Sequence, residues 1–412
     1  MRTYVLGAGV SKTVGYPLGT ELFGAIDEFI RESGACHDRF DYRKDWQELH
    51  QWLEANANPA IVQAYRTENI EHLLTALDFV ETLRSDALFG SWRAARRATE
   101  QSAKEASFET FEAFDREVGL YRRYRSILMW ALEHYFSWRH HEDAKHVNSH
   151  GWDVLNRFAD KLAPGDVVIT FNYDATLERA LLAQGKWSPS NGFGFDLEFH
   201  ESRHDRTPTL LGESQVVVLH LHGATGWYRR PAFAPDFHLP PQGYGALPRE
   251  AFGPAPLETN ISLDPEFLQG LGIFNVDACL PDAPPMGDER HVMLHPSFLK
   301  DYETDESGSH VFTKLWRKAA QALRDSELAY VVGYSLPKAD SAALTLFLTS
   351  CREGAARVVN PDGGTKMRLG RLLRSGDSLE GTATLKEWVD AGCPDRIPWR
   401  PRADPHRGPR VA

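Results

Sequence analysis

The feature that most constrains the fold is a short apolar run that ends abruptly in polar residues, within 166–174. Val167 to Ile169 are β-branched and carry no charge, as in a strand buried on both faces of a parallel sheet. The run ends in a polar turn, and apolar residues then recur at helical spacing: Leu177, Ala180, Leu181 and Leu182. The stretch predicts a strand, a turn and a helix, and in open α/β sheets such turns bind ligands. An ordinary turn whose Asn and Asp cap the helix explains the same pattern.

Similar apolar runs occur elsewhere and also end in small or polar residues. They lie at 3–6, 216–221, 328–332 and 356–359, and they run into Gly7, His222, Gly333 and Asn360. Together with the helical patterns between them, these runs predict an α/β fold: a Rossmann-like parallel sheet flanked by helices, with a large helical insertion.

The first of these turns reads Gly7-Ala8-Gly9-Val10-Ser11. Such a turn lets backbone N–H groups approach a pyrophosphate, and the Ser11 hydroxyl can bind a phosphate or a ribose. The dinucleotide pattern is incomplete, because its third glycine would fall at Lys12. A tight turn without a ligand is the alternative.

Composition limits the classes of function. Apolar residues make up 42% and charged residues 25% of 412, which is ordinary for a soluble globular protein. No apolar run is long enough for a membrane helix and the amino terminus leads into a strand, so we expect a cytoplasmic protein without membrane contact. A net charge of −11 makes direct nucleic-acid binding unfavourable. The four cysteines are far apart and indicate neither disulfides nor a four-cysteine zinc site.

Helical periodicity dominates between the first two predicted strands. We therefore predict a sheet domain formed by 1–40 and 163–392, a helical insertion at 41–162, and an extended Arg/Pro-rich tail at 393–412. A helix with Thr20 as its cap follows the first turn. Residues 188–215 predict a loop or hairpin, and the Pro/Gly-rich stretch 231–285 predicts a cover over the carboxyl edge of the sheet.

Two groups of residues that contain histidines are candidate metal ligands. His200, His204 and Asp205 lie near one another in the sequence, and His220 and His222 are two residues apart. No further ligand with usable spacing accompanies either group, so no metal is expected.

The motifs at the strand ends follow one another in an order that resembles a known family. The Gly7 turn, the Thr170/Asn172/Asp174 pattern, His222-Gly223, Gly333-Tyr334-Ser335 and Val359-Asn360 follow the order seen in sirtuin-type NAD-consuming enzymes. Further segments resemble the sirtuin-like domains of bacterial anti-phage defence proteins. These segments are Leu294-His295-Pro296, Lys300-Asp301-Tyr302, Leu315-Trp316, and Val332 to Pro337 with Asp340.

The resemblance implies an NAD+ glycohydrolase that releases nicotinamide and ADP-ribose and depletes NAD when activated, with NAD as substrate. It also implies a homo-oligomer and a partner protein, such as an ATPase or another defence protein. By resemblance, Asn172 orients the nicotinamide ribose and the water, Asp174 holds the carboxamide, and His222 relays a proton. The remaining binding residues are Gly7, Ala8, Gly9, Ser11, Thr170, Gly333, Ser335 and Asn360.

Two other functions stay open at this point. One is an NAD-dependent protein-lysine deacylase, although sirtuin deacylases carry a four-cysteine zinc module and an Asp-Phe-Arg segment that this chain lacks. The other is a non-catalytic nucleotide-sensing module, which the presence of both Asn172 and His222 disfavours.

Overall fold

The structure is a computed structural model, and only part of the chain is described. The described ranges are 1–32, 42–56, 150–195, 197–200, 208–209, 212–229, 262–263, 271–273, 290–293, 311–337, 340–374 and 383–394, with helical residues 70, 73, 74, 124, 127, 128, 131, 132, 135, 136, 138 and 139. Cys36, Cys279 and the tail from residue 395 lie outside them, as does most of the predicted cover at 231–285.

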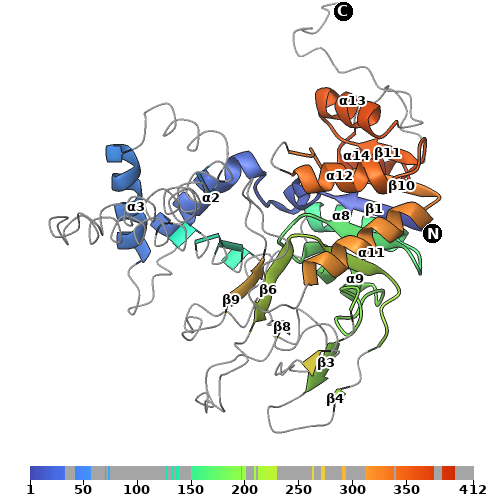
Figure 1. Ribbon diagram of the computed structural model, residues 1–412, viewed down its shortest axis with the longest axis horizontal. Helices are drawn as coiled ribbons and strands as arrows, with labels where there is room; N and C mark the ends of the chain where they lie inside the picture. The colour runs from blue at the N-terminus through green and yellow to red at the C-terminus, as the bar shows by residue number, and fades with distance from the viewer. Residues whose placement is uncertain are drawn as a thin grey trace, which may run out of the picture.

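A five-stranded parallel sheet forms the centre of the fold (Figure 1). Its strands are β1 (Arg2–Leu6), β2 (Val167–Thr170), β5 (Val217–His220), β10 (Leu328–Val332) and β11 (Ala356–Val359). These are the five apolar runs of the sequence, and every pairing between them is parallel. The predicted α/β class is therefore confirmed.

The strand order places the first strand in the middle. The order is β11-β10-β1-β2-β5, so the chain runs outward from β1 through β2 to β5 and then returns to the other side of β1. The order reverses between β1 and β10. In open α/β sheets, ligands bind outside the carboxyl ends of the strands at such a reversal.

Helices cover both faces of the sheet. On one face lie α8 (His150–Lys161), α9 (Thr176–Ala183) and α14 (Leu385–Asp390), and the other face carries α11 (Val311–Asp325) and α12 (Ser341–Ser350) (Figure 1). Stacked rings from neighbouring strands, Tyr4 and Tyr330, lie 5.1 Å apart at their centroids. Phe158 of α8 packs on the first ring and Trp388 of α14 on the second.

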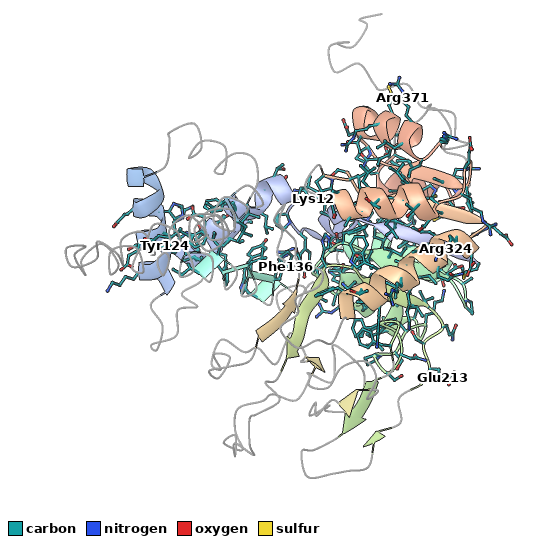
Figure 2. All side chains as sticks on the ribbon, in the orientation of Figure 1. Lys12, Tyr124, Phe136, Glu213, Arg324 and Arg371 are labelled. Carbon is teal, nitrogen blue, oxygen red and sulfur yellow. The ribbon has the colours of Figure 1, made fainter. Side chains whose placement is uncertain are left out.

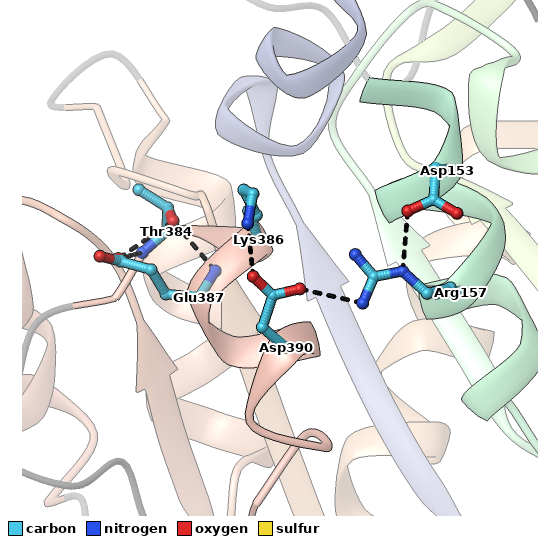
Figure 3. A network of polar contacts seen from close by, with 6 residues as sticks. All are labelled: Asp153, Arg157, Thr384, Lys386, Glu387 and Asp390. Atoms are coloured by element: carbon cyan, nitrogen blue, oxygen red, sulfur yellow. Dashed lines mark hydrogen bonds and ion pairs between the residues drawn. The ribbon is translucent and has the colours of Figure 1, made fainter. Parts of the chain in front are cut away.

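Surface polar contacts join α8 to α14 (Figure 3). The Arg157 guanidinium donates to Asp153 on its own helix at 3.0 Å and to Asp390 at 2.9 Å. Thr384 and Glu387 form a capping box that starts α14. Since exposed ion pairs contribute little to stability, the buried aromatic contacts hold the two helices together.

The helix α8 immediately precedes the second strand of the sheet. Residues 150–161 fall inside the predicted insertion, but α8 packs against α9 and α14 on the sheet. Its buried side chains include Trp152, Leu155 and Phe158. α8 therefore packs on the sheet, as part of the crossover connection that the parallel strands β1 and β2 require.

A helical region follows the first turn of the sheet domain. It contains α2 (Gly19–Glu32) and α3 (Tyr42–Asn56), which contact each other through Phe23 and Trp46. The predicted first helix is confirmed, but Thr20 does not cap it, because α2 already begins at Gly19. The Glu21 carboxylate instead accepts the Leu18 N–H at 2.9 Å.

Short antiparallel strands extend from the sheet domain. β3 (Leu197–His200) pairs with β4 (Pro208–Thr209), as the predicted hairpin requires, and with β7 (Ser262–Leu263). The prediction missed β6 (Gly223–Arg229), which pairs with β8 (Leu271–Ile273) and β9 (Arg290–Met293). The remaining short elements are α1 (Ala8–Ser11), the 3₁₀ helix η1 (Lys12–Val14) and α13 (Gly363–Leu372). Within the described residues, no helix is long and apolar enough to cross a membrane.

Candidate functional site

The turns that follow β1 and β10 touch each other at the reversal point of the sheet. The Gly9 N–H donates to the Gly333 carbonyl at 3.0 Å, and Gly333 has a positive φ of 61°. A Cβ on Gly9 would lie 2.8 Å from the Gly333 Cα, and one on Gly7 would lie 2.6 Å from the Tyr334 Cα. The close approach of the two backbones therefore explains why glycine occupies these positions without a ligand. This agrees with the alternative interpretation of the first turn as a tight turn that binds nothing.

A first polar cluster joins the turns after β1 and β2. The Ser11 hydroxyl donates to Asp174 Oδ2 at 2.7 Å and accepts from Asn172 Nδ2 at 2.9 Å. The same Nδ2 donates to the Gly7 carbonyl at 3.1 Å. We call Ser11, Asn172 and Asp174 the asparagine cluster. These three predicted residues, far apart in the sequence, form one hydrogen-bonded unit.

Asp174 is the buried anchor of the asparagine cluster. Its Oδ1 accepts from the Thr176 N–H at 3.1 Å and from the Thr176 hydroxyl at 2.6 Å, at the start of α9. Burial raises the pKa of the Asp174 carboxyl above its ordinary value, although the bonds from Thr176 and Ser11 act in the opposite direction. Because both oxygens already accept hydrogen bonds, the geometry favours a supporting role over direct contact with a substrate carboxamide.

A second polar cluster contains His222, Asp340 and Tyr334, which we call the histidine cluster. His222 Nε2 lies 3.5 Å from Asp340 Oδ2, and the Tyr334 hydroxyl donates to the same oxygen at 2.7 Å. All three side chains are buried. A carboxylate beside an imidazole orients the ring and stabilises its protonated form, which is what a proton-relay histidine needs.

Aromatic rings connect the two clusters. Phe171 and Tyr173, on either side of Asn172, both contact the His222 ring, at 5.2 and 6.2 Å between centroids. Phe171 also stacks on Tyr334 at 4.4 Å with an angle of 5° between the ring planes. Asn172 therefore sits between two residues that pack on His222, while its own amide points to Ser11 and Gly7.

The other predicted site residues mostly support these turns. Thr170 Oγ1 accepts the Asn172 N–H at 3.1 Å. Asn360 donates to the Tyr334 carbonyl at 3.3 Å and accepts the Asp362 N–H at 2.9 Å, so its amide links the turns after β10 and β11. Ser335 is exposed and belongs to neither cluster among the described contacts.

The accessible part of this sheet edge is small. Ala8, Gly9, Asn172 and Gly333 are half-buried, whereas Ser11, Asp174, His222 and Asp340 are buried. A ligand approaching the described surface meets the Asn172 side chain and the backbone of the glycine turns first.

His220 has a different environment from His222. Its ring is fully buried, with Nε2 against the Glu178 carboxylate of α9 and Nδ1 3.1 Å from the Asn172 carbonyl oxygen. Burial acts to lower the pKa of His220, but the Glu178 carboxylate and the Asn172 carbonyl raise it, and the pKa ends above its ordinary value. Sequence reasoning missed Glu178, because its position beside Leu177 looks like the polar side of an amphipathic helix.

No metal site emerges in the described part of the chain. No group of three or more His, Cys, Asp or Glu residues there could hold an ion. The side chains of His200, His204 and Asp205 lie outside the described set. Cys351 and Cys393 are free thiols.

Comparison with known proteins adds no family to this picture. No model of a known protein family matches the sequence, and no curated protein is significantly similar to it. The two clusters and their position on the sheet are therefore the basis of the proposed function.

Proposed function

We propose that this chain is an NAD+ glycohydrolase that uses the carboxyl edge of its sheet between β1, β2 and β10. The observation that carries the proposal is the half-buried Asn172 amide, held by Ser11 and Gly7 next to the buried histidine cluster. It lies beside the reversal of strand order, where doubly wound sheets bind nucleotides.

The reaction breaks the bond between nicotinamide and the ribose carbon and adds water to that carbon. Nicotinamide takes the bonding electrons and leaves as a neutral molecule, so no strong acid is needed. Positive charge develops on the ribose carbon, as in other glycosyl transfers. The attacking water loses one proton, so the products are nicotinamide, ADP-ribose and a proton.

The chain's residues divide this work. Asn172 orients the nicotinamide ribose and the water, since its side-chain amide has two fixed hydrogen bonds and the residue is half-buried. His222 accepts the proton from the water or a ribose hydroxyl, and the Asp340 carboxylate stabilises the imidazolium that forms. Asp174 holds Ser11, and through it the Asn172 amide. The N–H groups of Gly9 and Gly333 already donate to the Gly333 and Val359 carbonyls, so we assign a phosphate to the Ala8 N–H at the start of α1.

The biological setting rests on the resemblance alone. A role in anti-phage defence, activation by assembly of several copies and a partner such as an ATPase belong to the same proposal. The reaction itself does not depend on them.

Product analysis tests the proposed reaction. Incubation of the purified chain with NAD should release nicotinamide and ADP-ribose in equal amounts without any acylated peptide. Chromatography separates both products from NAD. Nicotinamide released only with an acylated peptide, together with O-acyl-ADP-ribose, would establish the deacylase instead.

A further inference from the structure

His220 joins two elements beneath the asparagine cluster. It ends β5, and its imidazole lies between Glu178 in the first turn of α9 and the backbone of Asn172 after β2. The side chains of His220 and Glu178 are 0% and 1% exposed, so neither can touch a substrate directly. The Asn172 carbonyl is the contact through which this pair reaches the asparagine cluster.

The partners of the His220 ring determine where one of its protons lies. A carbonyl oxygen only accepts hydrogen bonds, so His220 Nδ1 must carry a proton and donate it to the Asn172 carbonyl 3.1 Å away. The Glu178 carboxylate at Nε2 holds the ring in this orientation, and its negative charge balances the positive charge of the protonated ring. The donor at Nδ1 is thus preorganised by a buried ion pair.

The hydrogen bond from His220 Nδ1 adds to the other bonds that hold Asn172 in place. The Asn172 N–H is held by Thr170 Oγ1 at 3.1 Å, and its side-chain amide by Gly7 and Ser11. The His220 bond holds the one remaining backbone group of this residue, its carbonyl. Without it the backbone that follows Asn172 is held less firmly, and a shift of the Asn172 Cα would move the side-chain amide with it.

We propose that His220 is a positioning residue for Asn172, acting through the hydrogen bond from Nδ1 to the Asn172 carbonyl, with Glu178 holding the ring. This inference rests on the proposed NAD+ glycohydrolase function. It separates the two histidines by role: His222 exchanges a proton with the reactants, and His220 fixes the residue that orients them.

Two substitutions of His220 separate its two contacts. In His220→Asn the side-chain amide nitrogen takes the place of Nδ1 and keeps the bond to the Asn172 carbonyl, but it does not reach Glu178. In His220→Gln the amide nitrogen takes the place of Nε2 and keeps the bond to Glu178 only. The double variant His220→Asn/Glu178→Gln removes the buried charge that His220→Asn leaves without its partner.

Steady-state kinetics and hydrogen–deuterium exchange provide the readouts. His220→Gln should lower kcat roughly 100-fold and change KM by less than about threefold, because misplacing an orienting group affects the transition state most. His220→Asn and the double variant should stay within about tenfold of the wild-type kcat. Peptides covering residues 171–175 should exchange faster in His220→Gln than in His220→Asn.

A purely structural role of His220 predicts a different order of kcat among the variants. His220→Asn leaves Glu178 buried without its partner and should therefore be the less stable single variant. If kcat followed stability, so that His220→Gln was the more active, the positioning role would be wrong. If the wild type releases no nicotinamide, the proposed function fails, and the exchange rates at 171–175 then decide the positioning role: equal rates in both variants overturn it.

Discussion

Asp174 shows at the residue scale how burial changes the chemistry of a predicted site residue. The sequence marks it only as a carboxylate after a strand, whereas the structure buries it and uses both oxygens. Because its folded pKa lies above the ordinary 3.8, the folded chain binds the proton more tightly than the unfolded chain. The stabilising contribution is present below that ordinary value and is lost as the pH rises through the folded pKa.

Asp174→Asn should therefore gain stability relative to wild type as the pH rises. The asparagine cannot ionise, so the difference in unfolding free energy between the variant and wild type should shift in favour of the variant from about pH 4 to pH 7. Denaturant titrations at several pH values measure this difference. A constant difference would mean that Asp174 titrates as an exposed carboxyl does.

The contact of two turns is the element-scale feature that the site depends on. Gly9→Ala should lower the unfolding free energy by about 1–3 kcal/mol, since the new Cβ meets the Gly333 backbone rather than a flexible side chain. Gly24→Ala in α2 is the matched control: its Cβ meets nothing within 4 Å, so it should stabilise the chain by up to about 1 kcal/mol. Thermal and denaturant unfolding measure the stability of both variants. Equal effects at the two positions would show that the turns move apart easily.

At this scale the sequence predicts strands far better than contacts. Short, largely apolar runs such as Val167 to Ile169 identify buried parallel strands, and all five are found in the sheet. The meeting of Ser11 with Asp174, or of His222 with Asp340, depends on strand order and helix placement, which local periodicity does not contain. Glu178 was missed for the same reason, because a buried charge looks like a surface charge until its partner is known.

For the molecule as a whole, the ring of Tyr173 connects the helical region to the histidine cluster. Phe136 lies where this region meets the sheet domain (Figure 2), and its ring is 6.0 Å from both Tyr16 and Tyr173. Tyr173 in turn packs on His222. A rearrangement of the helical region, for example on assembly, would therefore reach the residues beside Asn172.

Phe136→Leu should change activity more than stability explains. We expect a loss of about 1 kcal/mol in unfolding free energy, together with a roughly tenfold lower kcat/KM through Tyr173. Phe158→Leu is the control, because Phe158 is also buried in the core but contacts Tyr4 and Trp388 instead. It should lose stability and keep its kcat/KM. Equal losses of kcat/KM would mean that general destabilisation is the cause.

Nicotinamide release by Asn172→Ala and His222→Ala is the most direct test of whether the edge of the sheet that holds Asn172 and His222 cleaves NAD. Each change should lower the rate by roughly 10²–10⁴-fold while the variant remains folded. Thr345→Ala on the exposed side of α12 serves as the control and should keep the wild-type rate. Wild-type rates in both Asn172→Ala and His222→Ala, with NAD still cleaved, would contradict the account and place the reaction elsewhere on the chain.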